Sequence, residues 1–291
     1  MADLVTGELE QVTEPLCYHG EGPVWSPTWG GLRWVDMLAG DVLTLRAEGE
    51  SPADAVVERM HVGDVAAFVR PRTRGGWVVA TERGIARADD ADGMPTPWVT
   101  LWDDPGVRMN EGGVDGEGRL WAGSMGYDRV PGTAALYRVD AEGDWETVLP
   151  DVTISNGIDL SPDRTLAYYN DTETLRTDVF DVRDGELAGR RPFATPGTGH
   201  PDGLTVDSAG NVWVALNGTG RVRCYSPQAE VLAEVALPLR LVTSCTLGGP
   251  DLRDLYLTTS REDLDDPEPQ AGALFRIRVA VPGLPVRAFA G

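Results

Sequence analysis

The chain has 291 residues, with 46 acidic against 25 basic side chains and a formal net charge of −21. This excess of negative charge repels phosphate backbones and anionic lipid headgroups, so it argues against a nucleic-acid or membrane partner. No apolar run reaches the roughly 18 residues of a membrane-spanning helix, and the acidic N-terminus does not resemble a signal peptide, so we expect a cytoplasmic protein.

A short strand centred on an aromatic residue recurs along the whole chain. Its aromatic residues follow one another at intervals of 43 to 47 residues. In chain order they are Trp34, Trp77, Trp121, Tyr168, Trp213 and Tyr256. Turns rich in Gly, Asp or Pro precede most of these strands, as at residues 115–118 (DGEG), and such turns join antiparallel strands. The 35 glycines and 21 prolines argue against long helices.

A period near 44 residues with about four short strands in each unit is typical of a propeller blade. Six units account for nearly the whole chain, so we predict an all-β fold, a single six-bladed β-propeller domain over residues 1–291. Residues 8–14 (ELEQVTE) are expected to close the ring by pairing with the last blade. The Pro/Gly-rich residues 281–291 are predicted to form an edge strand or a tail. A β-sandwich with chance spacing is the alternative.

The repeat also indicates where a site lies, because the inner strands of all blades converge on one axis. Stepping back 11 to 13 residues from each aromatic residue reaches one position in each blade. These positions are Glu21, Asp64, Asn110, Asn156, Asp202 and Ser244.

Four of the six positions, Glu21, Asn110, Asn156 and Asp202, carry a carboxylate or an amide close to a glycine. Two carboxylates and two amides in a ring form a set of hard oxygen ligands suited to a divalent cation. Each Asn-Gly or Asp-Gly pair alone is also an ordinary turn whose side chain caps its own backbone. Their shared phase favours a common metal site. Without thiolate or histidine ligands, Ca²⁺ is favoured, with Zn²⁺, Mn²⁺ and Mg²⁺ as alternatives.

Four segments then make the chain recognisable. They are residues 21–25 (EGPVW), 155–171 (SNGIDLSPDRTLAYYND), 201–215 (PDGLTVDSAGNVWVA) and 243–259 (TSCTLGGPDLRDLYLTT). In this order and spacing they resemble the gluconolactonase/regucalcin (senescence marker protein) family. The resemblance runs from about Gly20 to the C-terminus, and it implies a six-bladed propeller, one catalytic divalent metal ion and hydrolysis of sugar lactones.

The resemblance also implies roles for individual residues. Carried over by motif, Glu21, Asn156 and Asp202 are metal ligands, and Arg108 and Asn110 lie beside the metal and contact the substrate. Apart from Arg108, the same positions came from the phase of the repeat.

Three positions depart from the family pattern. The segment after the third-blade Asn is Asn-Glu-Gly rather than Asn-Asp-Gly, and His200 stands where Arg is common. In GSMGYD, either Asp128 or Tyr127 takes the place of an acidic substrate-binding residue, or the contact is absent. These differences leave the fold and the metal site but put the identity of the substrate in doubt.

The expected activity is that of a metal-dependent lactonase. The cation polarises the lactone carbonyl and lowers the pKa of a bound water, Asp202 or Glu21 accepts the water's proton, and Arg108 orients the substrate through forked hydrogen bonds. The expected partner is a small-molecule lactone, and the expected assembly is a monomer or small homo-oligomer.

Three alternatives stay open. One is a related propeller hydrolase that acts on a phosphoester, another acts on a specialised-metabolite lactone, and the third is a non-catalytic calcium-binding regulatory protein. A pure binding module needs no open coordination position for water, so turnover distinguishes it from the enzymes.

Overall fold

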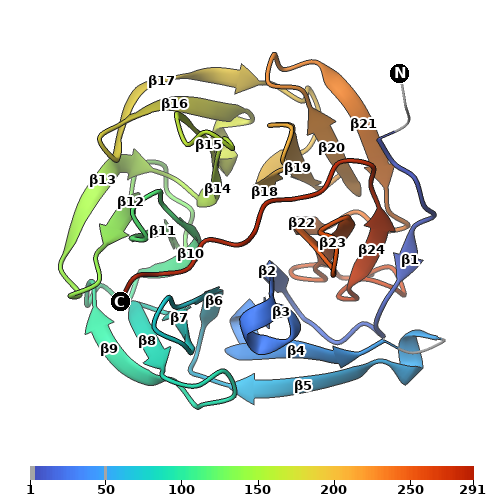
Figure 1. The fold of residues 1–291 in the computed structure, drawn as a ribbon, viewed down its shortest axis with the longest axis horizontal. Coiled ribbons are helices and arrows are strands. Elements are labelled where there is room, and N and C mark those ends of the chain that lie inside the picture. The colour runs from blue at the N-terminus through green and yellow to red at the C-terminus, as the bar shows by residue number, and fades with distance from the viewer. Residues whose placement is uncertain (1–3, 49–50) are drawn as a thin grey trace.

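Six four-stranded antiparallel sheets stand around one axis in the computed structural model, which describes residues 4–48 and 51–291 (Figure 1). Within five of the sheets the strands follow one another in chain order, from the innermost strand at the axis to the outermost strand at the rim. The sheets are the blades of a six-bladed β-propeller, as the repeat predicted.

Blades one to three use the first half of the chain. Blade one comprises β2 (Gly20–Ser26), β3 (Gly31–Asp36), β4 (Asp41–Ala47) and β5 (Val56–His61). Blade two comprises β6 (Ala66–Pro71), β7 (Trp77–Thr81), β8 (Gly84–Ala88) and β9 (Thr96–Thr100). Blade three comprises β10 (Val107–Val114), β11 (Leu120–Gly126), β12 (Ala134–Val139) and β13 (Trp145–Val152).

Blades four to six use the second half. Blade four comprises β14 (Ser155–Leu160), β15 (Leu166–Asp171), β16 (Thr177–Arg183) and β17 (Glu186–Ala194). Blade five comprises β18 (His200–Val206), β19 (Val212–Asn217), β20 (Arg221–Tyr225) and β21 (Val231–Ala236). Blade six comprises β22 (Val242–Gly248), β23 (Asp254–Thr259), β24 (Phe275–Arg278) and the N-terminal β1 (Glu10–Gln11).

Helical structure in the described residues is limited to four short 3₁₀ segments. They are η1 (Pro27–Trp29), η2 (Met37–Ala39), η3 (Pro52–Asp54) and η4 (Thr172–Thr174). Within residues 4–48 and 51–291, no helix has the length and apolar character needed to cross a membrane.

The recurring aromatic residues form the core between blades. All six lie on the second strand of their blades, and none exposes more than 4% of its surface. Trp77 of blade two belongs to a cluster that also contains Val35 of blade one and Leu120 of blade three. One buried aromatic residue in each blade therefore joins neighbouring sheets, which explains why the repeat is visible in the sequence.

The ring closes where the two ends of the chain meet, as predicted. Strand β1 pairs antiparallel with β24, with Glu10 opposite Arg276 and Gln11 opposite Phe275. The guanidinium of Arg276 also lies 2.6 Å from the Glu10 carboxylate. The N-terminal segment thus supplies the outermost strand of the last blade and removes an open edge between first and last blades.

Residues 280–291 form a tail rather than an edge strand. The tail crosses one face of the propeller over the central axis (Figure 1). The backbone nitrogen of Gly283 donates to the Leu252 carbonyl at 2.7 Å, and that of Ala290 donates to the Gly118 carbonyl at 2.8 Å. Phe289 is fully buried, with its ring centroid 5.6 Å from that of Trp98. The axial channel is therefore covered on this face, and the tail leaves the opposite face uncovered (Figure 1).

Replacing a core aromatic residue should destabilise the ring. Trp77→Ala leaves a cavity between blades and should cost about 3–5 kcal/mol of unfolding free energy. Trp145, which is 43% exposed on the outer strand β13, provides the matched control. Trp145→Ala should change the free energy of unfolding by less than about 1 kcal/mol. Urea denaturation followed by circular dichroism checks both. Equal midpoints for the two variants would contradict the assignment of Trp77 to the core.

Candidate functional site

Irregular pairing on the innermost strands turns selected side chains toward the axis. In blades three, four and five, the register between first and second strands shifts by one residue at a β-bulge. The first residues of the unpaired segments are Asn110, Asn156 and Asp202. Glu21 is the last paired residue before the corresponding shift in β2. Because a bulge bends its strand and re-aims a side chain, four equivalent irregularities bring these residues together.

Two glycines allow the inner strands to approach closely. A Cβ atom on Gly157 would lie 2.5 Å from the backbone nitrogen of Leu204 in the next blade. A Cβ on Gly203 would lie 2.0 Å from the Ser244 hydroxyl oxygen in the blade after that. Only glycine fits at both positions, and each directly follows a site residue. The glycines therefore allow the close approach to the axis expected from the sequence.

Two oxygen atoms at this centre are buried without a hydrogen-bond donor in the described part of the chain. They are Oδ1 of Asn156 and Oδ1 of Asp202. The other atom of each group is held: Asn156 Nδ2 donates to the Thr172 hydroxyl at 3.0 Å, and Asn217 Nδ2 donates to Asp202 Oδ2 at 2.8 Å. Each side chain is thus fixed so that its remaining oxygen has no protein partner. A buried oxygen without a hydrogen-bond partner destabilises the folded state unless a cation or another ligand binds to it.

The carboxylates at the centre repel one another. Burial raises the pKa of Glu21 well above its usual range, and the nearby Asp202 and Glu111 carboxylates raise it further. Burial likewise raises the pKa of Asp202 to about 8, although the Asn217 hydrogen bond opposes this. A divalent cation between Glu21 and Asp202 would relieve the repulsion.

The set of oxygen atoms fits a hard divalent cation. Two carboxylates, Glu21 and Asp202, and the amide of Asn156 supply only oxygen. Within the residues that the structure describes, no three His, Cys, Asp or Glu side chains gather as a metal-binding cluster, so a cation bound here would need an amide oxygen as its third donor. Mixed carboxylate and amide oxygens are typical of calcium sites.

Arg108 stands beside this centre and is held by Asn110. The Arg108 guanidinium donates to Asn110 Oδ1 at 2.9 Å and to the Met109 carbonyl at 3.0 Å. The Asn110 amide nitrogen in turn donates to the Ser155 carbonyl at 2.9 Å. The Asn110 oxygen therefore already accepts a hydrogen bond from Arg108. The two roles predicted for Asn110, metal ligand and substrate contact, stay predictions.

The residues after strand β11 occupy different environments. The Tyr127 ring centroid lies 5.9 Å from the Arg108 guanidinium carbon, and its hydroxyl donates to Glu82 at 2.7 Å. Asp128 is exposed, and its Oδ1 accepts a hydrogen bond from the Val130 backbone at 3.2 Å. Arg129, rather than Asp128, lines the central cavity. Tyr127 and Asp128 as substrate contacts stay predictions.

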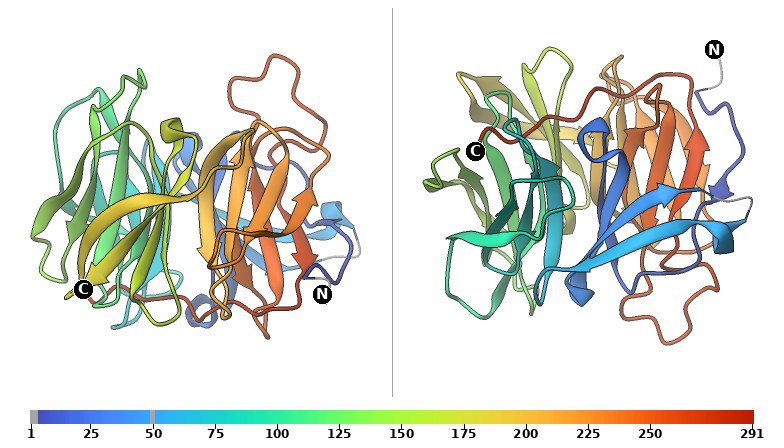
Figure 2. Two further views of the ribbon diagram at one scale, coloured as in Figure 1. Left: turned by 90° about the horizontal axis from the view of Figure 1, so that it is seen from above. Right: turned by 60° about the horizontal axis from the view of Figure 1, so that its bottom comes forward.

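A cavity of about 330 Å³ opens above the centre. Part of its lining comes from the segment between β23 and β24, which projects from the face opposite the tail (Figure 2). Its lining includes residues from the axis and from the loops around it. They are His19, Glu21, Arg108, Asn110, Met125, Arg129, Ile154, Asn156, Thr172, Glu173, His200, Asp202, Asn217, Leu241, Ser260, Glu262, Asp263 and Leu264. The volume lies within the range of small-molecule pockets, and its floor carries the buried carboxylates.

Comparison with known proteins identifies the family of the chain. Residues 19–261 match the family model described as SMP-30/Gluconolactonase/LRE-like region. The chain belongs to this family. A 6-deoxy-6-sulfogluconolactonase of Pseudomonas putida is 39% identical over 284 residues, which cover 94% of this chain and 95% of the relative. A pentonolactonase of Haloferax volcanii is 35% identical over 293 residues, covering 95% and 96% of the two chains.

A solved structure of the same family extends the comparison. The crystal structure of a calcium-binding protein, regucalcin, from Agrobacterium tumefaciens superposes on this chain with a TM-score of 0.88. The two are 27% identical, and the match covers 99% of each chain. The fold is thus shared over the whole length.

The expected axial position in blade two is wrong. Asp64 is exposed in the turn before β6, and the unpaired residue of that inner strand is Ala67, ten residues before Trp77. Trp77 is the first residue of β7, whereas the corresponding aromatic residues of the other blades lie further along their strands. A step of 11 to 13 residues back from Trp77 therefore passes the inner strand β6 and reaches the turn before it. In blade six, the unpaired residue is Thr243, and its neighbour Ser244 donates to Glu111 at 3.3 Å.

Several polar residues of this gluconolactonase-family site were not found from the sequence. Asn217 is the last residue of β19 and Thr172 directly follows β15, and they orient Asp202 and Asn156 through hydrogen bonds. Their position at strand ends is a weak signal. Glu262 lies in the irregular segment between β23 and β24, where no periodicity indicates the direction of a side chain.

Stability of the metal-stripped protein should fall as the pH rises. The folded pKa of Asp202, about 8, lies above its ordinary value of 3.8, so the folded state binds this proton more tightly. Stability is therefore lost between about pH 4 and pH 8, and Glu21 acts in the same direction. Asp202→Asn should flatten this decline, and saturating Ca²⁺ should reduce it in the wild type. Urea midpoints across this pH range test this, and parallel profiles for variant and wild type would contradict it.

Proposed function

We propose that this protein hydrolyses sugar lactones with the help of one divalent metal ion held by Glu21, Asn156 and Asp202, with Asn110 at the edge of the site. The observation that carries the proposal is a pair of buried oxygens at the floor of the cavity, Asn156 Oδ1 and Asp202 Oδ1, which accept no hydrogen bond from residues 4–48 and 51–291. Relatives named as lactonases of sugar lactones support the reaction class. Ca²⁺ is the favoured ion on ligand chemistry, with Zn²⁺, Mn²⁺ and Mg²⁺ as alternatives.

When bound, the divalent ion supplies a Lewis acid for the lactone carbonyl and a water of lowered pKa. The chain's own residues position the substrate and move the proton. The buried Arg108 guanidinium, oriented by Asn110, donates hydrogen bonds to substrate oxygens. The proton that leaves the attacking water goes to one of the two buried carboxylates, Asp202 or Glu21. The ring C–O bond breaks, the same carboxylate returns the proton to the departing ring oxygen, and the product is the open hydroxy acid.

A second candidate function is calcium binding without turnover. The solved relative described as a calcium-binding protein favours it. The same carboxylates and amide serve either function, but binding alone makes no use of a cavity with Arg108 in its wall.

Hydrolysis should depend on the metal and on its proposed ligands. Metal-stripped protein should open aldonolactones only after a divalent ion is restored, and Asn156→Ala or Asp202→Ala should lower kcat/KM by about 100-fold or more, because a ligand is lost. Asp64→Ala, at the exposed off-axis position, serves as the matched control and should retain activity and metal. A pH-indicator assay with aldonolactones and added Ca²⁺, Zn²⁺, Mn²⁺ or Mg²⁺ makes the measurement.

Two results would contradict this proposal. Full turnover and full metal content in Asn156→Ala would show that the metal site is elsewhere. Tight metal binding without hydrolysis of any lactone would favour the calcium-binding function, and turnover of phosphoesters alone would change the reaction class.

Arg108→Ala should separate substrate handling from metal binding. The variant should lose about 10- to 100-fold in kcat/KM, as expected for a lost hydrogen bond to a charged group, while it keeps its metal. Metal content by atomic emission, measured beside the kinetics, distinguishes the two roles. Loss of the metal in this variant would assign Arg108 a structural role instead.

A further inference from the structure

The segment between β23 and β24 forms a loop that overhangs the cavity. It stands out from the face opposite the C-terminal tail (Figure 2). Its base is fixed to blade one, because the Arg261 backbone nitrogen donates to the Tyr18 carbonyl at 3.0 Å and the Asp263 nitrogen lies 3.3 Å from the Tyr18 hydroxyl. Within the loop, the Glu262 nitrogen donates to the Ser260 hydroxyl at 2.9 Å. These contacts hold the loop in one position relative to the axis.

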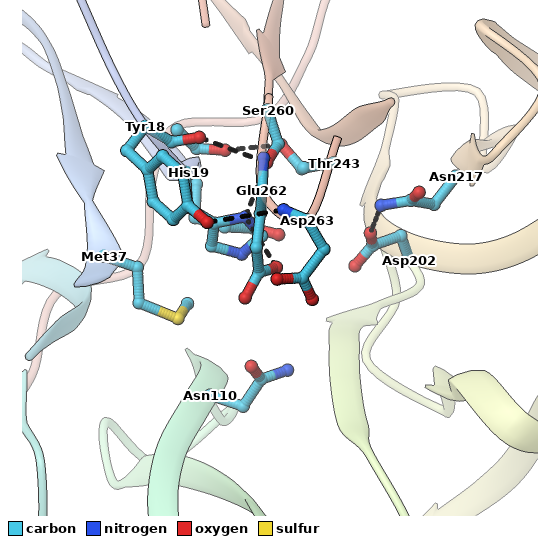
Figure 3. A network of polar contacts seen from close by, with 12 residues as sticks. Tyr18, His19, Met37, Asn110, Asp202, Asn217, Thr243, Ser260, Glu262 and Asp263 are labelled. Atoms are coloured by element: carbon cyan, nitrogen blue, oxygen red, sulfur yellow. Dashed lines mark hydrogen bonds and ion pairs between the residues drawn. The ribbon is translucent and has the colours of Figure 1, made fainter. Parts of the chain in front are cut away.

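The loop directs the Glu262 carboxylate into the cavity. In Figure 3 the side chains of Glu262 and Asp263 point toward the space between Met37, Asn110 and Asp202. The side chain of Glu262 is only 18% exposed. Unlike Glu21 and Asp202, Glu262 lies on a loop above the floor of the cavity, so it faces the part of a substrate that is away from the reacting carbonyl.

Glu262 contacts the His19 ring. Glu262 Oε2 lies 3.3 Å from His19 Nδ1, which is also 2.8 Å from the Ser260 hydroxyl. Burial raises the pKa of Glu262 above its ordinary value, and Arg108 and Arg129 oppose this. No Arg or Lys nitrogen of the described residues lies within 4 Å of its carboxylate. Glu262 therefore keeps acceptor capacity for a ligand.

Carboxylates outnumber arginines around the upper cavity. Apart from Glu21 and Asp202, the charged lining consists of the arginines Arg108 and Arg129 and the three acids Glu173, Glu262 and Asp263. Arg129 is also partly neutralised, since its guanidinium lies 3.5 Å from the Asp263 carboxylate. A substrate that brought a further negative charge to this region would be repelled, and one that brought hydroxyl groups would find acceptors.

We propose that Glu262 determines specificity by accepting hydrogen bonds from the hydroxyl groups of a neutral polyhydroxylated lactone and by excluding lactones with an anionic group at the end away from the carbonyl. This inference rests on the proposed lactonase function. A lactone that carries a sulfonate, such as the one for which the Pseudomonas putida relative is named, is therefore expected to be a poor substrate of this chain, because the sulfonate would lie against the acids of the upper cavity.

Charge removal at Glu262 tests the proposal. The substrates are glucono-1,5-lactone, which is neutral, and its 6-phospho and 6-deoxy-6-sulfo counterparts, which are anionic. Wild-type holoenzyme should prefer the neutral lactone by at least about tenfold in kcat/KM. Glu262→Gln should raise KM for the neutral lactone by about 10- to 100-fold and lower KM for the anionic ones, so the preference shrinks or reverses. Metal content and urea midpoint should stay unchanged.

Asp265→Asn is the matched control, since Asp265 is exposed on the same loop and does not line the cavity. It should keep the wild-type preference, which excludes a general effect of net charge. A preference of the wild type for an anionic lactone would overturn the proposal. So would equal selectivity of Glu262→Gln and Asp265→Asn, even with the lactonase function intact. Failure of the wild type to open any lactone contradicts the proposed function and overturns this inference with it.

Discussion

The site depends on the close packing of the inner strands around the axis. Because Gly157 and Gly203 leave no room for a side chain between neighbouring blades, Asn156 and Asp202 are drawn into a buried position near Glu21. Burial there raises the pKa of both carboxylates and leaves two oxygens without donors. A local cost of this kind is typical of functional sites.

The rest of the fold keeps that arrangement in place. Pairing of β1 with β24 closes the ring, and the buried aromatic residue of each blade joins adjacent sheets. The tail, anchored by the buried Phe289, covers the channel on one face. The cavity is lined by Arg108 and by the loop that carries Glu262. The proposed reaction would take place at the floor of this cavity, and the proposed selection of the substrate would take place at its rim.

The sequence predicted the structural features that repeat in every blade, and it did not predict the loop residues that lie outside the repeat. Trp34 to Tyr256 revealed the blades because each must fill the same space between sheets, and the phase of the repeat reached Asn110, Asn156 and Asp202 because equivalent strands carry equivalent bulges. The same phase failed at Asp64, where Trp77 begins its strand and the aromatic landmark is displaced. Glu262 and Arg129 lie on loops, whose conformation follows from tertiary contacts such as those with Tyr18 rather than from any repeat.

The most direct test of the metal centre is anomalous diffraction from crystals soaked in Mn²⁺, recorded near the manganese absorption edge. A single strong peak is expected on the propeller axis, within coordination distance of Glu21, Asn156 Oδ1 and Asp202 Oδ1. A peak elsewhere, or an axis without one while the protein in solution binds one ion tightly, would contradict the assignment of these residues as the metal ligands.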